Sequence, residues 1–401
     1  MSSTIDVSDE IQGFITDLIA KYNWEPVSEI KYYEGSNLGD GYACKHIAVE
    51  IIRKNDTIRL FIKYPAGIKL PEGDSDIDKL YLNEVYFYTT IFKTYQNFLG
   101  EKGLKSDLVS VPKCYGSSAD NTIALENLRD KGYTLFDRKQ FMNDEHIKLV
   151  LRSFARWHGT SFAFKDQRKG DFEELAKHCG TNLWNGQNND SAILKMYTGI
   201  VEGCLAKFDQ VKDKHLLERC TIEVLQDSLK EFGCNQDEYA VITKGDCWCN
   251  NMMFLYEGDN PKDVMQLDWQ LIEVASPVYD ISYFFYSVAS EESLSKLDDY
   301  LRFYHSELAE QIRKLGGDPD ELYPFSILEK EWKLYSKYGF ALTFMVFKIM
   351  LVNQDEVPKL EEVDFENKGN GADVFPKFDN EDEYVGRIRV LAEFLVKNDY
   401  I

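Results

Sequence analysis

The stretch KGDCWCNN, residues 244–251, directly follows the apolar run 239–242, which is typical of a buried β-strand. A turn needs only one short polar side chain, whereas this one contains Asp246, Asn250 and Asn251. Side-chain oxygens that gather at the end of a strand suit a hard cation or a proton transfer. The stretch therefore predicts a site of chemistry rather than a simple change of chain direction.

A second strand is predicted to return to the same place. The run 264–267 ends at Asp268, and residues 258–261 supply a turn between the two strands. Pairing of the strands would bring Asp268 beside Asn251, where both offer oxygen ligands to Mg²⁺. Asp246 then stays free to accept a proton from a substrate hydroxyl, as phosphoryl transfer requires. The D-x4-N spacing alone fits a polar hairpin with a capping aspartate equally well.

Two charged residues earlier in the chain favour phosphoryl transfer. Lys63 lies late in the strand-like run 59–64, where its ammonium can reach the α- and β-phosphates of a nucleotide. Glu84 lies in the helical run 79–98 and can hold that ammonium as an ion pair. Taken singly, each residue is better explained as a solvated surface residue.

A glycine-rich turn with Gly35, Gly39 and Gly41 lies between the first two expected strands. Such a turn suits a backbone that must approach phosphates closely. It does not match the stricter G-x-G-x-x-G pattern, so it is only a weak indication.

The order of elements predicts the fold class. Strand patterns fill residues 31–64, and another lies at 123–126, whereas helical patterns dominate after residue 143 except around 240–272. An amphipathic helix is expected at 8–22.

We therefore expect an α+β, two-lobed protein-kinase-like fold. The small strand-rich N-terminal lobe spans 1–128, with a hinge at 125–128. The large, mostly helical lobe spans 129–401 and carries the catalytic loop, the metal site and the acceptor pocket; it ends in an acidic loop at 361–383 and a last helix at 383–397.

Composition and charge limit the partners. The chain has 401 residues, with 46 basic and 68 acidic side chains, which gives a formal net charge of −22. Such a surface repels polyphosphate backbones, so we expect no nucleic-acid partner and no general binding to anionic membranes. A single nucleotide remains compatible, because one metal ion and a few local cations can offset its charge.

The same composition suggests a cytoplasmic protein. The first residues, MSSTIDVSDEIQGF, lack the basic start and apolar run of a secretory signal. The longest apolar stretch, 340–352, contains Lys348 and falls short of the ~20 residues of a membrane-spanning helix. The 8 cysteines show no regular framework and are expected to be reduced thiols.

Four segments carry a resemblance to a known family: LENLRDKGY (125–133), VITKGDCWCNNMMF (241–254), LDWQ (267–270) and SPVYDISYFF (276–285). Together they resemble the ecdysteroid kinase-like family of insects and other invertebrates, also called the CHK kinase-like domain. That family is related to choline kinases and aminoglycoside phosphotransferases. The resemblance runs from about residue 30 to residue 350, and its specific part is the block 241–285.

The resemblance implies an ATP- and Mg²⁺-dependent enzyme that transfers the γ-phosphate to a hydroxyl of an ecdysteroid or a similar lipophilic alcohol. The steroid 22-hydroxyl is the leading acceptor. Asp246 would be the catalytic base, with Asn251 and Asp268 as magnesium ligands. Lys63, held by Glu84, would contact the phosphates.

Further positions follow from the same resemblance. Gly39 and Gly41 would lie in the loop over the phosphates, and the backbone from Glu126 to Leu128 would form the hinge that binds adenine. Asp280 would brace the catalytic loop from within a helix, although a helix-start aspartate is an equally good explanation.

The chain departs from the family at Lys244, because the family usually has histidine in the triplet H-G-D. That histidine is understood as a brace for the loop. A lysine cannot accept a hydrogen bond at neutral pH, so the brace must change. We expect the long stem of Lys244 to turn outward and to place its ammonium near a carbonyl or a carboxylate.

Two alternatives therefore stay open beside the ecdysteroid kinase: a choline or ethanolamine kinase, which needs a cage for a cation, and a non-catalytic ligand-binding pseudokinase. The identity of the acceptor and the oligomeric state are not determined.

Other residues have simpler explanations. Cys247 and Cys249 have no second Cys or His pair at zinc spacing nearby. His158 is expected to be a core or loop-bracing histidine. The aromatic residues between Trp332 and Phe347 are expected to be helical core, although one face of them could line an acceptor pocket.

Overall fold

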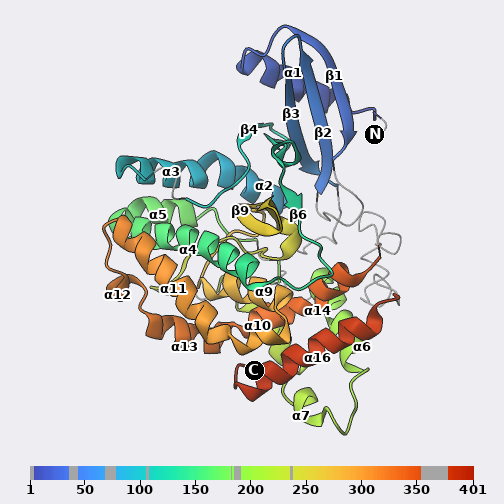
Figure 1. Cartoon of the computed structure of the whole chain (residues 1–401), viewed down its shortest axis with the longest axis vertical. Helices are drawn as coiled ribbons and strands as arrows, with labels where there is room; N and C mark the ends of the chain where they lie inside the picture. The colour runs from blue at the N-terminus through green and yellow to red at the C-terminus, as the bar shows by residue number, and fades with distance from the viewer. Residues whose placement is uncertain are drawn as a thin grey trace.

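The computed structural model describes residues 4–35, 44–67, 78–104, 108–181, 183–184, 191–234, 238–353 and 378–401. The chain forms two lobes of unequal size, as expected, with the strand-rich lobe above the helical one in Figure 1. This is the α+β arrangement that the order of elements predicts.

The N-terminal lobe is an antiparallel sheet in the order β1-β2-β3-β5-β4. Its strands are β1 (Val27–Glu34), β2 (Cys44–Arg53), β3 (Thr57–Pro65), β4 (Cys114–Ser117) and β5 (Ile123–Glu126). Helix α1 (Asp9–Lys21) covers one face of this sheet, and Ser8 caps its start. The helix buries a stripe of apolar residues at helical spacing: Ile11, Phe14, Ile15, Leu18 and Ile19.

Strand β3 contributes side chains both to the core and to a cavity. Successive side chains of a strand point to opposite faces. Leu60 and Ile62 therefore join the core under α1, whereas Phe61 and Lys63 line a cavity on the other face. The strand thus presents Lys63 towards the gap between the lobes.

A helical segment lies between β3 and β4 and packs against the second lobe. Helix α2 (Asp78–Tyr86) continues through a π-helical turn (Phe87–Ile91) into α3 (Phe92–Glu101). The predicted helix at 79–98 is therefore confirmed, with a π-helical turn that the sequence pattern did not indicate. Glu84 is on α2 and is only 3% exposed.

The C-terminal lobe consists mainly of helices around two small antiparallel sheets. One sheet pairs β7 (Val241–Thr243) with β10 (Glu273–Ala275), and the other has the order β6-β8-β9. The strands of the latter are β6 (Thr134–Leu135), β8 (Met252–Glu257) and β9 (Asn260–Gln266). The turn before β9 is shorter than predicted, because Asn260 and Pro261 already pair with β8.

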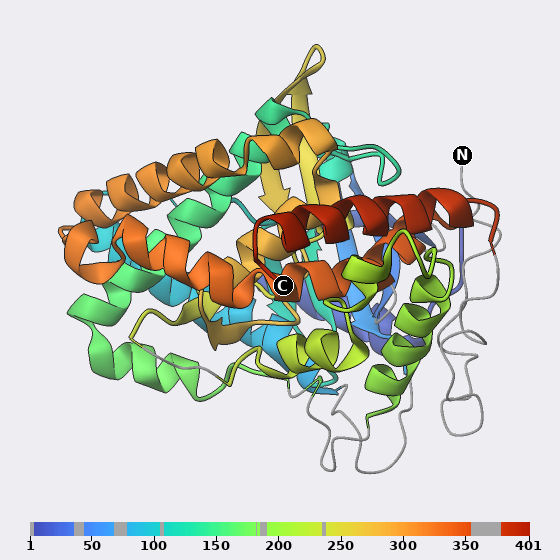
Figure 2. The same ribbon diagram turned by 90° about the horizontal axis from the view of Figure 1, so that it is seen from below.

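The helices of this lobe surround a common core (Figure 2). They are α4 (Asp144–Gln167), α5 (Lys169–Ala176), α6 (Ala192–Leu205), α7 (Lys214–Leu217), α8 (Ile222–Lys230), α9 (Val278–Val288), α10 (Glu291–Ser295), α11 (Leu297–Lys314), α12 (Pro319–Leu322), α13 (Phe325–Tyr335), α14 (Lys337–Leu351) and α16 (Glu381–Lys397). Every residue of α9 is buried, which is typical of a helix enclosed on all sides.

Among the described residues, no single helix combines the length and the apolar composition that a membrane span needs. The consecutive segments Pro319–Tyr335 and Lys337–Leu351 reach that length and composition only together, across a 51° bend.

Candidate active site

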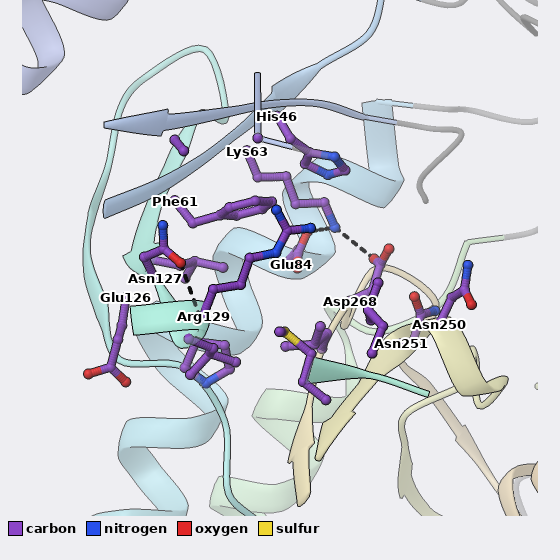
Figure 3. A pocket seen from close by; sticks show the side chains of 18 of the residues that line it. His46, Phe61, Lys63, Glu84, Glu126, Asn127, Arg129, Asn250, Asn251 and Asp268 are labelled. Carbon is purple, nitrogen blue, oxygen red and sulfur yellow. Dashed lines mark hydrogen bonds and ion pairs between the residues drawn. The ribbon is translucent and has the colours of Figure 1, made fainter. Parts of the chain in front are cut away.

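A buried lysine links the two lobes. Lys63 Nζ lies 2.6 Å from Glu84 Oε2 and 2.8 Å from Asp268 Oδ1, as the dashed lines in Figure 3 show. Lys63 is 6% exposed. The predicted pair with Glu84 is therefore present, and the surface explanation of both residues is wrong.

Charge compensation keeps Lys63 and Asp268 ionised. Burial opposes protonation of Lys63, but Asp268 and Glu84 outweigh it and raise the pKa of the ammonium. Burial alone would raise the pKa of Asp268, yet the Lys63 ammonium outweighs it and holds that pKa below its ordinary value. Asp268 is thus a carboxylate at neutral pH.

The hairpin of β8 and β9 brings Asp268 to Asn251, as predicted. Leu267 N–H donates to the carbonyl oxygen of Asn251 at 2.9 Å. Asp268 then adopts a left-handed backbone with φ of 57°, a conformation that costs a non-glycine residue of order 1 kcal/mol or more. Such strain is typical of a functional position.

Asn251 also contacts Asp246. Its side-chain Nδ2 donates to Asp246 Oδ2 at 2.7 Å, which leaves the amide oxygen for another partner. Asn251 and Asp268 both line the same cavity. An amide oxygen and a carboxylate are hard ligands, and Mg²⁺ commonly uses one or two such groups together with phosphates. The donor set therefore fits this ion.

Asp246 is held by both of its oxygens. Oδ1 accepts a hydrogen bond from the Tyr283 hydroxyl at 3.0 Å, and Oδ2 accepts the one from Asn251. Burial raises the pKa of Asp246, and the nearby Lys244 ammonium partly offsets this effect. Sequence reasoning missed Tyr283, although it follows Asp280 by one helical turn and so lies on the same face of α9.

Lys244 is bound inside the protein. It is 0% exposed, and its Nζ donates to the carbonyl oxygen of Asp246 and, at 3.0 Å, to that of Asp268. The ammonium also lies 5.8 Å from the centre of the Trp269 ring. The ammonium lies near carbonyl oxygens, as expected. The expectation that the stem turns outward is wrong, because these two carbonyls and an aromatic face attract the ammonium inward.

Asp280 fixes the start of the same loop, as predicted. Its carboxylate accepts hydrogen bonds from Lys244 N at 2.7 Å and Gly245 N at 2.8 Å. His158 Nε2 lies 3.0 Å from the same carboxylate, so the expected loop-bracing histidine is confirmed. Burial opposes ionisation of Asp280, but His158 and the two N–H groups hold its pKa below the ordinary value.

Gly245 cannot be replaced without moving this loop. Its φ is +83°, and a Cβ atom would lie 2.0 Å from the carbonyl oxygen of Leu271. The glycine of the K-G-D triplet is thus required by a close approach of two backbones.

A cavity lies between the lobes beside these groups. Ala48 and Phe61 come from the sheet, residues 125–129 from the connection between the lobes, and Met253 and Leu267 from the β8–β9 hairpin. A slot with apolar walls and a few polar groups is the usual form of a small-molecule site.

The backbone of the connection offers limited polar groups to the cavity. Glu126 N–H already donates to the carbonyl oxygen of Lys113 at 2.9 Å. Glu126 therefore keeps only its carbonyl oxygen for a ligand. Leu128 N–H begins a 3-10 helix and has no hydrogen-bond partner among the described residues. Gly39 and Gly41 lie outside the described residues.

Two further basic side chains line the cavity without having been predicted. His46 is in register with Lys63 across β2 and β3, and Arg129 lies at the end of the connection between the lobes. Burial and the Lys63 charge lower the pKa of His46 to about 4. The register would have indicated His46, whereas nothing in the sequence pattern indicates Arg129.

The aromatic residues of α13 and α14 belong mainly to the core. The buried ones are Trp332, Tyr338, Phe340, Phe344 and Phe347. None of them lines the cavity between the lobes. Cys247 and Cys249 are buried as well.

Comparison with known proteins identifies one family. The sequence model of the ecdysteroid kinase-like family matches residues 39–317. No curated protein sequence matches the chain.

The solved structures that match the chain have low sequence identity to it. The ethanolamine kinase of Plasmodium vivax is 13% identical with a TM-score of 0.47, covering 100% of this chain and 94% of its own. The gentamicin complex of APH(2")-IIa is 13% identical with a TM-score of 0.40, covering 89% and 99%. The GDP complex of aminoglycoside 2'-phosphotransferase-IIIa is 13% identical with a TM-score of 0.36, covering 86% and 99%.

Proposed function

The chain belongs to the ecdysteroid kinase-like family, and we propose that it transfers the γ-phosphate of ATP to a hydroxyl group of a small lipophilic molecule. One observation carries the proposal. The Lys63 ammonium contacts both Glu84 and Asp268 in a cavity that Asn251 also lines. A phosphate-binding cation thus lies next to two oxygen ligands for a metal ion, which is the arrangement that phosphoryl transfer needs.

In this proposal Asp246 accepts the proton of the acceptor hydroxyl. Tyr283 and Asn251 fix its two oxygens, so the carboxylate is oriented before the substrate arrives. Asp246 is partly exposed, which leaves room for a hydroxyl to approach. Its pKa is raised by burial, which makes the carboxylate a stronger base.

Lys63 contacts the phosphates, with Glu84 holding the ammonium in place. Asn251 and Asp268 would hold Mg²⁺, which neutralises phosphate charge when it is bound. The carbonyl oxygen of Glu126 and the N–H of Leu128 would bind adenine at the hinge.

Lys244 supports an active enzyme rather than a pseudokinase. Its ammonium joins the carbonyl oxygens of Asp246 and Asp268. In place of the family histidine, Lys244 therefore joins the catalytic loop at Asp246 to the chain at Asp268. The base and both proposed metal ligands are also present.

The acceptor proposed first is an ecdysteroid, because the family carries that activity in its name. Choline and ethanolamine are the second class. A test is the transfer of labelled γ-phosphate from ATP to a panel of ecdysteroids, choline, ethanolamine and plant-derived alcohols. We expect a labelled product with an ecdysteroid or another lipophilic alcohol. A product with choline or ethanolamine alone would change the substrate class.

The kinase itself is tested in the same assay. The Asp246→Asn variant, which keeps the shape of the side chain, is the matched control. Transfer that is equally fast in this variant would show that Asp246 is not the base. Absence of transfer to every acceptor, in protein that does bind ATP with Mg²⁺, would favour the pseudokinase.

A further inference from the structure

Arg129 is a cation in the cavity with no assigned role. It is the second residue of the 3-10 helix Leu128–Lys131, which follows the hinge. Figure 3 shows its side chain extending from that helix into the cavity, on the side of Phe61 and Lys63. A cation at this place lies in reach of any ligand that fills the cavity.

The other charges of the same helix are already paired. Asp130 Oδ1 lies 2.9 Å from Arg59 Nη1, and Lys131 forms an ion pair with Glu126. Arg129 has no acidic partner among the described residues, and it is exposed to solvent. Its backbone is fixed nevertheless, because Arg129 N–H donates to the capping side chain of Asn127 at 3.2 Å. The helix thus presents one uncommitted guanidinium to the cavity.

The other charged groups of the cavity differ from the Arg129 guanidinium. Lys63 is shared between two carboxylates, Glu84 and Asp268, so these three groups together carry a net negative charge. His46, which responds to the charges of both Lys63 and Arg129, has a pKa lowered by burial to about 4 and is neutral at pH 7. Among the described lining residues, Arg129 is therefore the cation that no carboxylate contacts.

We infer that Arg129 binds phosphate oxygens of the nucleotide, as a second cation beside Lys63. The inference rests on the proposed function, because it assigns the ligand as a nucleoside triphosphate. Such a ligand carries more negative charge than one divalent cation neutralises. A planar guanidinium offers paired N–H donors that match phosphate oxygens.

The experiment compares nucleotides that differ only in phosphates. Binding of adenosine, ADP and ATP, each with Mg²⁺, is measured by calorimetry for the wild-type protein and for Arg129→Ala, Arg129→Lys and Lys131→Ala. Lys131→Ala is the matched control, because it removes a cation from the same helix that does not line the cavity.

The expected result is a selective loss. Arg129→Ala should weaken ADP and ATP binding about 10- to 100-fold, the range of one hydrogen-bonded charge contact. Adenosine binding should change less than about twofold, as should all binding by Lys131→Ala, because Lys131 does not line the cavity. Arg129→Lys should recover part of the loss, because it keeps the charge and loses the planar donor pair.

Three results would overturn the inference. An equal loss for adenosine would show a contact with the base rather than with phosphate. If the wild-type protein binds ATP and Arg129→Ala binds it with the same affinity, the inference about Arg129 is wrong, whereas the proposed function is unaffected. A wild-type protein that binds none of the three ligands would end both.

Discussion

Two buried lysines lie on either side of Asp268, and their surroundings differ. Lys63 reaches it from the sheet and is balanced by two carboxylates, at 2.6 and 2.8 Å. Lys244 reaches it from the helical lobe and donates to two main-chain carbonyl oxygens instead. Two carboxylates compensate the charge of Lys63, whereas Lys244 holds two main-chain carbonyl oxygens in place. We therefore expect the Lys63 region to control nucleotide binding and stability, and the Lys244 region to control turnover.

The largest expected effect is in the Lys244 region. Asp246→Asn should lower kcat about 10²- to 10⁴-fold, the range of a lost general base. ATP affinity should stay within about threefold, because the variant keeps the side-chain shape and leaves Lys63 and Asp268 in place. Steady-state kinetics together with equilibrium binding separate the two quantities. A parallel loss of affinity would show that the roles of the two regions are assigned wrongly.

The Lys63 region should respond to substitution with a loss of both stability and ATP binding. Lys63→Met leaves the buried Glu84 and the half-buried Asp268 without their cation, which should cost about 3–5 kcal/mol of unfolding free energy. The apparent KM for ATP should rise as well.

The double variant Lys63→Met/Glu84→Gln should recover part of that stability, because one of the two uncompensated charges is gone. Urea unfolding of the two single variants and the double variant gives the coupling free energy. If the losses of unfolding free energy in the two single variants simply add in the double variant, charge compensation at Lys63 is contradicted.

Lys244 should give a smaller effect, seen mainly in kcat. Lys244→Met removes the donor to two carbonyl oxygens and should lower kcat about 10- to 100-fold. Since the Lys244 charge lowers the pKa of Asp246, its loss should raise that pKa. The acid limb of the pH profile of kcat/KM should then move to higher pH. Lys244→His should stay within about tenfold of wild type, or ~1.4 kcal/mol of barrier.

The outcome for Lys244→His can also contradict this account. If the wild-type protein is inert towards every acceptor and Lys244→His creates robust transfer, the lysine is a disabling change.

The smallest effect concerns Glu273, a half-buried carboxyl. Burial raises the pKa of Glu273 to about 7, and Val274 N–H donates to its Oε1 at 3.1 Å. A carboxyl whose pKa is higher in the folded state than in the unfolded state stabilises the fold at pH below about 4.5. That contribution is lost as the pH rises through about 7.

Glu273→Gln removes this titration. The variant should therefore be more stable than wild type at pH 8, by ~1–3 kcal/mol, and equally stable near pH 4. Thermal unfolding at both pH values is the measurement. A difference that does not depend on pH would show that packing, not ionisation, sets the effect.

The sequence predicted those parts of the site that follow from local periodicity. The alternation of β3 and the turn of the β8–β9 hairpin were sufficient to place Lys63 and to bring Asp268 to Asn251. Burial could not be predicted in this way, because it depends on how the lobes meet. Lys63 and Lys244 each resembled surface residues until the positions of the carboxylates and the carbonyl oxygens were known.

Long-range contacts account for the remaining omissions. Tyr283 contacts Asp246 across 37 positions of sequence, and the pattern of α9 shows only that this residue is in an apolar helix. Arg129 enters the cavity because of the course of a short 3-10 helix, which has too few residues for a periodic signal.

The most direct test of the account is a calorimetric titration of ATP, with and without Mg²⁺, into the wild-type protein and the Asp268→Asn variant. We predict that wild-type binding depends on Mg²⁺, and that Asp268→Asn loses this dependence together with most of its affinity. Asp268 would then be a metal ligand next to Lys63. Wild-type binding that is indifferent to Mg²⁺, or an Asp268→Asn variant that binds Mg-ATP as the wild type does, would contradict the proposed kinase site.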